Sequence, residues 1–122
     1  MTQIGNHLKI VAAQGLRDRC RGFYQDLLGC RLLESPLADL DLYQFEGGVV
    51  LGIFFVKPEE TLPEADYLKA TWLELKVPDP GAVKARLLHF GVKPVAYPDP
   101  TRFFFQAPGG QVFRLAPLDG GL

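Results

Sequence analysis

The sequence predicts an α+β protein made of two similar modules, each with one strand, one helix and three further strands. Two amphipathic stretches with helical spacing each end in a glycine, and strand-like segments flank both. The distance from Gly29 to Gly48 and the distance from Gly91 to Gly110 are both 19 positions (48 − 29 and 110 − 91). The two halves therefore superpose at an offset of 62, which indicates an internal duplication.

The first module covers residues 4–57. Its helix, over residues 15–29, has apolar residues at helical spacing and Gly29 as a left-handed cap. Gly47 and Gly48 are predicted to form a hairpin turn between the last two strands. The four expected strands are HLKIVAA (7–13), CRLLES (30–35), LDLYQFE (40–46) and VVLGIFFV (49–56).

The second module covers residues 69–118 and follows a linker at 58–68, PEETLPEADYL, which has two prolines, four acids and no apolar periodicity. Its helix is expected to begin with Asp79 as the N-cap and Pro80 at the first position. The expected strands are TWLELKVP (71–78), VKPVAY (92–97), TRFFFQA (101–107) and QVFRLAP (111–117). At 122 residues, the two modules form a chain of single-domain size.

Composition argues against several classes of partner. Thirteen basic and fourteen acidic residues give a net charge of −1, so no strong field attracts nucleic acid or an anionic membrane. No apolar run approaches the roughly 18 residues of a membrane span, and the amino terminus does not resemble a signal peptide. Cys20 and Cys30 have no metal or redox spacing, so we expect two free thiols and a cytoplasmic protein.

Three segments resemble the vicinal oxygen chelate superfamily, which contains glyoxalase I, the extradiol dioxygenases and the bleomycin-resistance proteins. They are GFYQDLLGCRLLE, WLELKVPDPGAVKARLLHFGV and FFFQAPGGQVFRLAP. The resemblance covers almost the whole chain and implies tandem βαβββ modules. In that fold a curved mixed and antiparallel sheet forms a concave cavity, with the helices outside.

The resemblance also implies four metal-ligand positions, and they fall on His7, Gly52, Trp72 and Arg114. Glycine has no donor side chain, indole cannot coordinate a cation, and the guanidinium charge would repel a cation. Three positions are therefore lost, and no other ligand set is evident. We expect neither a metal nor another cofactor.

Strand alternation then gives a predicted cavity wall. If Phe113 and Leu115 pack on the helix, Arg114 faces the cavity, together with Trp72 and Glu74 on the neighbouring strand. An even residue count across each glycine turn adds further aromatic side chains; this count is an assumption. The predicted ligand-binding residues are Arg114, Trp72, Glu74, His7, Phe54, Tyr43, Phe103 and Phe105.

Such a wall suits a neutral or anionic compound with an aromatic or apolar body, held by arginine and stacked on aromatic rings. The structural alternative is an Arg114–Glu74 ion pair that only neutralises the cavity. The functional alternative is a glyoxalase-like or dioxygenase-like enzyme that uses an unrecognised metal site, or Glu74, His7 or Lys9 as acid or base. A third interpretation is a structural or protein-interaction module. The resemblance also implies a homodimer.

Overall fold

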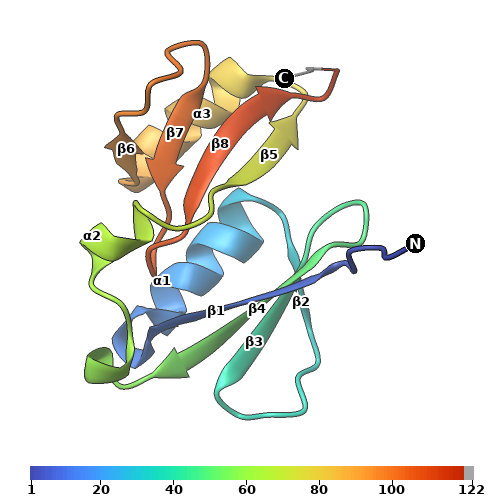
Figure 1. Ribbon diagram of the computed structural model, residues 1–122, viewed down its shortest axis with the longest axis vertical. Helices are drawn as coiled ribbons and strands as arrows, with labels where there is room; N and C mark the ends of the chain where they lie inside the picture. Colours follow the sequence, from blue (N-terminus) through green and yellow to red (C-terminus); the bar gives the residue numbers. More distant parts are fainter. Residues whose placement is uncertain (120–122) are drawn as a thin grey trace. The chain divides into compact units, whose positions relative to one another are not determined.

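The computed structural model describes residues 1–119 and confirms the predicted α+β class. The chain divides into two compact units, Met1–Thr61 (unit 1) and the described residues from Leu62 onward (unit 2). Each unit contains a four-stranded mixed sheet and helices (Figure 1). In both sheets the first strand is parallel to the last, and the other pairs are antiparallel. The predicted order of one strand, one helix and three strands is therefore present twice. No described helix has the length and apolarity to cross a bilayer.

Unit 1 has the strand order β1-β4-β3-β2. The predicted helix changes its geometry along its length, from a 3-10 turn through one α-helical turn to a π-helical end. The elements are β1 (His7–Ala13), η1 (Gln14–Leu16), α1 (Arg17–Arg21), η2 (Gly22–Leu27), β2 (Arg31–Leu33), β3 (Leu40–Gln44), β4 (Val50–Val56) and η3 (Pro58–Glu60).

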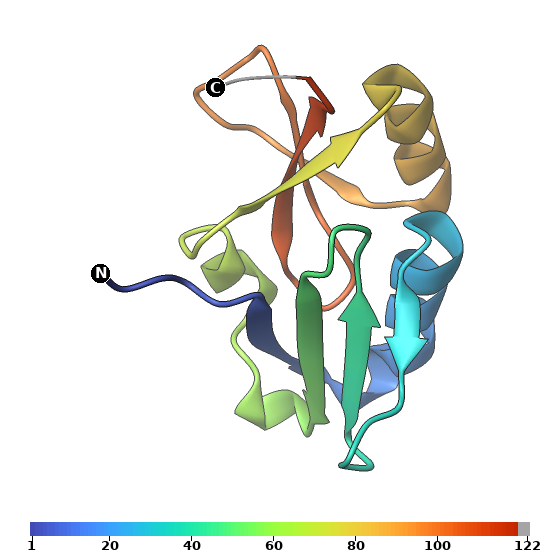
Figure 2. The same cartoon turned by 90° about the vertical axis from the view of Figure 1, so that its right-hand side faces the viewer.

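The helical segment covers one face of the unit 1 sheet (Figure 2). The wider π turn lets two consecutive residues, Phe23 and Tyr24, enter the core, whereas the α-helical pattern predicts only Phe23. The Tyr24 ring stacks on that of Tyr43, with centroids 4.9 Å apart. Leu51, Ile53 and Phe55, which alternate along β4, complete this apolar core.

Asp41 is a buried carboxylate that links α1 to the sheet. It is 2% exposed and accepts hydrogen bonds from Arg17 Nη2 (2.7 Å), Arg21 Nε (2.9 Å) and the Tyr43 hydroxyl (2.9 Å). Burial opposes ionisation, but the hydrogen bonds from Arg21, Arg17 and Tyr43 hold the pKa of Asp41 well below its usual range. These hydrogen bonds offset the free-energy cost of burying the charged carboxylate.

Unit 2 has the strand order β5-β8-β7-β6. Its helix begins and ends as predicted: the Asp79 carboxylate accepts a hydrogen bond from the Ala82 N–H at 3.1 Å, and Gly91 ends the helix at φ 101°. The helix lies along β5 and β8 (Figure 1). The elements are α2 (Glu64–Tyr67), β5 (Leu73–Val77), α3 (Pro80–Phe90), β6 (Lys93–Val95), β7 (Phe103–Gln106) and β8 (Val112–Pro117).

Part of the predicted linker is a packed element. Tyr67, at the end of α2, is 8% exposed, and its ring lies against Gly110 in the β7–β8 hairpin. The Gln106 side-chain amide donates to the Glu64 carbonyl at 2.9 Å and to the Gly110 carbonyl at 3.0 Å. The aromatic ring and the amide therefore attach α2 to the hairpin, although the segment has no apolar periodicity.

The two glycine hairpins have the same hydrogen bonds at the offset of the duplication. In unit 1 the Phe45 N–H donates to the Val49 carbonyl, and the Gly48 N–H donates to the Phe45 carbonyl. In unit 2 the Ala107 N–H donates to the Gln111 carbonyl, and the Gly110 N–H donates to the Ala107 carbonyl. Gly47, Gly48, Gly109 and Gly110 all have positive φ. Each hairpin therefore connects its strands through five residues, 45–49 and 107–111.

Both thiols are predicted to be unreactive while the protein is folded. Cys20 and Cys30 lie in the core of unit 1, and burial raises the pKa of each to about 12. An aromatic disulfide reagent at neutral pH is expected to modify the native protein about a hundredfold more slowly than the denatured chain. Rapid, stoichiometric modification of the native protein would show that these thiols are accessible.

Candidate functional site

Three aromatic side chains meet on the face of the unit 2 sheet opposite to α3. This aromatic cluster comprises Trp72, which precedes β5, Tyr97 from the β6–β7 connection, and Phe104 from β7. The Tyr97 and Phe104 rings stack with centroids 4.2 Å apart, and Trp72 meets Phe104 edge to face at 5.4 Å. The indole N–H donates to the Tyr97 hydroxyl at 3.1 Å. Phe104 is 2% exposed and Tyr97 is 45% exposed, so the cluster opens to solvent at Tyr97.

Arg114 of β8 lies against the aromatic cluster. Its guanidinium carbon is 4.6 Å from the centroid of the Trp72 ring, a cation–π arrangement. Its Nη2 donates to Glu74 Oε2, and Glu74 is the residue directly opposite on β5. The ion pair considered as an alternative from the sequence is therefore present. Within the described residues, the buried Nε of Arg114 has no hydrogen-bond acceptor, so the guanidinium keeps one donor that Glu74 does not use.

A second carboxylate influences the charge around Arg114. Hydrogen bonds from Thr101 lower the pKa of Asp99, and the positive charges of Arg102 and Arg114 contribute less. Arg114 thus interacts with a directly bonded carboxylate, Glu74, and with a second one, Asp99, in the β6–β7 connection. An anion that bound Arg114 would therefore compete with Glu74 for the guanidinium.

The predicted orientation of Phe103 and Phe105 is wrong. The five-residue hairpin pairs Phe104 with Arg114 and Phe105 with Phe113, so even-numbered residues share one face. Phe105 stacks on Phe113 with centroids 5.7 Å apart. Phe103 packs under Lys84 of α3, whose Nζ is 4.9 Å from the ring centroid. The assumption of an even count across the turn caused the error, and Phe104 takes the predicted place of its two neighbours.

The same correction applies to Tyr43 in unit 1. The hairpin pairs Leu42 with Gly52 and Tyr43 with Leu51, so Tyr43 faces the helical segment and is fully buried. Tyr43 supports Asp41 and does not line the open face of this sheet.

The open face of the unit 1 sheet has a different character. Lys9 lies opposite Gly52, and its Nζ is 5.4 Å from the centroid of the half-buried Phe54 ring. His7, at the start of β1, is exposed and shares the strand face of Lys9. His7 and Phe54 therefore have the predicted orientation. Among the described residues, His7 forms no ion pair with a carboxylate and belongs to no group of metal-ligating side chains.

The implied metal positions do not fit a metal ion. At Gly52 a Cβ atom would lie 3.3 Å from a methyl carbon of Leu42 and 3.4 Å from one of Leu40, so leucine side chains cover the position. Trp72 and Arg114 contact each other, and neither can coordinate a cation. Within residues 1–119 no group of three His, Cys, Asp or Glu side chains is arranged to hold a metal. His7 is the one remaining donor of the four positions.

Solved structures share this fold. The trypanothione-dependent glyoxalase I of Leishmania major aligns with a TM-score of 0.70 at 19% identity, over 95% of this chain and 87% of that one. The fosfomycin resistance protein FosX of Listeria monocytogenes, in complex with Mn(II) and sulfate, aligns with a TM-score of 0.74 at 12% identity, over 100% and 94%. TnmS3, an antibiotic binding protein of Streptomyces sp. CB03234, aligns with a TM-score of 0.58 at 20% identity, over 96% and 98%.

The chain therefore has the vicinal oxygen chelate fold, the fold of glyoxalase I and FosX, as its sequence motifs imply. At these identities the likeness establishes the fold alone. No protein-family model matches the chain, and no curated protein sequence matches it.

Proposed function

We propose that the chain binds a small organic molecule with an aromatic or apolar body and an anionic group, and that it does so without a metal ion. The carrying observation is Arg114: it stacks on Trp72, is 13% exposed, and keeps a buried Nε donor beside its bond to Glu74. A planar guanidinium is well suited to a carboxylate or phosphate, and the adjacent rings suit an apolar body.

The fold comparisons support the class of this proposal. TnmS3 is an antibiotic binding protein, so a protein with this fold can act by binding a small molecule. FosX, by contrast, has been crystallised with Mn(II), whereas three of the four metal-ligand positions that the resemblance implies carry no metal donor in this chain. The proposal therefore assigns to Arg114, in place of a metal ion, the electrostatic attraction of the ligand.

Trp72 provides a direct measurement of binding, because it is the sole tryptophan of the chain. We expect its fluorescence to change saturably with at least one member of a panel of aromatic carboxylates and phosphates. Arg114→Gln is expected to weaken that binding about tenfold, and Arg114→Lys to restore it only in part, because lysine lacks the guanidinium fork. Arg86→Gln, which removes an exposed charge from α3, is the matched control.

Equal affinity for the wild-type protein and Arg114→Gln would contradict the proposal, as would the absence of saturable binding across the panel. Preference for cationic compounds would contradict the assigned ligand charge.

Glu74 separates the binding proposal from the enzymatic alternative. If Glu74 competes with the ligand for Arg114, Glu74→Gln should tighten the binding of an aromatic carboxylate several-fold. If Glu74 instead acts as an acid or base, the same change should abolish turnover while substrate binding persists. Binding that strengthens in Glu74→Gln, together with no turnover in the wild-type protein, is the result that we expect.

The proposal also includes a homodimer in the cytoplasm, as the resemblance and the two reduced cysteines suggest. Light scattering coupled to size-exclusion chromatography should give the mass of two chains of 13.5 kDa. A mass of one chain over the micromolar range would contradict the dimer.

A further inference from the structure

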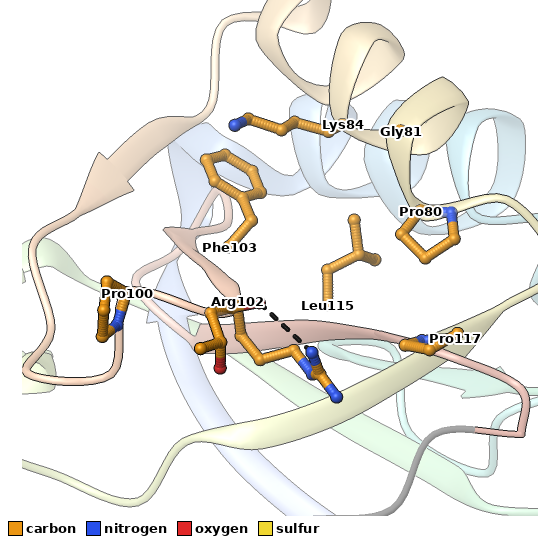
Figure 3. A pocket seen from close by; sticks show the side chains of 9 residues that line it. Pro80, Gly81, Lys84, Pro100, Arg102, Phe103, Leu115 and Pro117 are labelled. Atoms are coloured by element: carbon orange, nitrogen blue, oxygen red, sulfur yellow. Dashed lines mark hydrogen bonds between the residues drawn. The ribbon is translucent and has the colours of Figure 1, made fainter.

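An open cavity lies in unit 2 on the helix side of the sheet, separate from the aromatic cluster. It has a volume of about 340 Å³ and lies between the first turn of α3, the residues leading into β7, and β8 (Figure 3). This volume is within the range of natural small-molecule sites. Its walls come from Pro80, Gly81, Lys84, Pro100, Thr101, Arg102, Phe103, Leu115 and Pro117.

The charge of this cavity has one sign. Its lining includes two cationic side chains, Lys84 and Arg102, and no carboxylate. The acid nearest to the helix start, Asp79, uses its carboxylate to cap α3 through the Ala82 N–H at 3.1 Å. Asp99 interacts electrostatically with Arg102, but its own hydrogen bonds are with Thr101. The cavity therefore has an excess of positive charge.

The two cations are positioned by the fold. Lys84 extends over the Phe103 ring, with Nζ 4.9 Å from its centroid, at the edge of the cavity (Figure 3). Arg102 donates from Nη1 to the Thr101 carbonyl at 3.2 Å. Within the described residues its buried Nε has no hydrogen-bond acceptor. No described acceptor therefore uses this part of the guanidinium, which is an observation independent of the shape of the pocket.

The apolar part of the lining favours a ligand with an apolar body. Leu115 and Phe103 form the floor, and Pro80, Pro100 and Pro117 form walls without backbone N–H donors. We infer that this cavity binds a small carboxylate or phosphate attached to a ring or a short apolar chain, with Lys84 and Arg102 supplying the positive charge of the pocket and Phe103 against the body. This site is additional to the one at Arg114.

Phenyl phosphate and benzoate are suitable probes, and benzyl alcohol is the uncharged control. In titrations followed by amide chemical shifts, we expect saturable changes at Gly81, Thr101 and Phe103 with both anions. Lys84→Gln and Arg102→Gln should each weaken binding about tenfold, and Arg86→Gln, on the same helix, should leave it unchanged. Tighter binding of phenyl phosphate than of benzoate would identify a phosphate as the anion, and the reverse order a carboxylate.

The same titration in Arg114→Gln separates the two sites. In this variant the shifts at Gly81 and Thr101 are expected to persist, with the affinity for both anions unchanged. This result does not depend on whether the aromatic cluster binds a ligand. The inference is overturned if neither anion gives saturable shifts at these amides, if benzyl alcohol binds equally well, or if both charge-removing variants retain wild-type affinity.

Discussion

Asp41→Asn is expected to lower the free energy of unfolding by about 3 kcal/mol at neutral pH. The carboxylate accepts four hydrogen bonds, one from Arg17, two from Arg21 and one from Tyr43, and its loss leaves both arginines beside a neutral amide. Arg17 and Arg21 are 28% and 40% exposed, so water compensates part of the loss, which places the estimate at the lower end for a buried ion pair. Urea denaturation at neutral pH measures the difference.

The pH dependence of this effect has a definite sign. Because the folded protein lowers the pKa of Asp41, its contribution is fully present above the ordinary value of 3.8 and is lost as the pH falls below it. The difference in stability between wild type and Asp41→Asn should therefore shrink as the pH falls below about 4. Asp39→Asn, at an exposed position nearby, is the control and should stay within about 0.5 kcal/mol of wild type. A constant difference at all pH values would show that the ionised Asp41 carboxylate does not stabilise the folded protein.

Gly110→Ala is expected to destabilise the protein by about 3 kcal/mol. Two costs add at this position: φ is +113°, and a Cβ atom would lie 2.5 Å from Cδ2 of Tyr67. The tyrosine belongs to α2 and is 8% exposed, so the ring has little room to move. The measurement is again the free energy of unfolding from urea denaturation.

The internal duplication supplies a matched control, because Gly48 occupies the equivalent position in unit 1. Gly48 has φ +98°, but no atom lies within 4 Å of a Cβ placed there. Gly48→Ala should therefore cost only the backbone strain, about 1 kcal/mol. Equal costs at the two positions would show that the contact with Tyr67 contributes nothing to stability.

Much of the fold follows from local features of the sequence. The turn glycines and the Asp79 cap are each recognisable from a few neighbouring residues, and the structure places them as predicted. The attachment of α2 is different, because it depends on the contact of one tyrosine with a glycine distant in sequence. The burial of Tyr24 depends likewise on a π turn, for which helical periodicity gives no signal.

The candidate site was only partly predictable. Alternation placed Trp72, Glu74 and Arg114 on one face, and the structure brings these three into contact. The length of the hairpin loop decides which residues of β7 share a face with Arg114. A loop one residue longer or shorter would place Phe103 and Phe105 on that face instead of Phe104. Tyr97 lies in an irregular connection, where strand alternation does not apply. The repeated glycine spacing indicates that the two loops are equally long, but the sequence carries no signal for their length of five residues.

We propose that an organic anion at Arg114, without a metal ion, is the basis of binding in this protein. The most direct test is the metal content of the purified protein by elemental analysis, with a thermal-shift scan against divalent cations. We expect a metal content well below one ion per chain and no stabilisation by any divalent cation. One tightly bound nickel, zinc, manganese or iron ion per chain would contradict it, because Gly52, Trp72 and Arg114 provide no donor for such an ion.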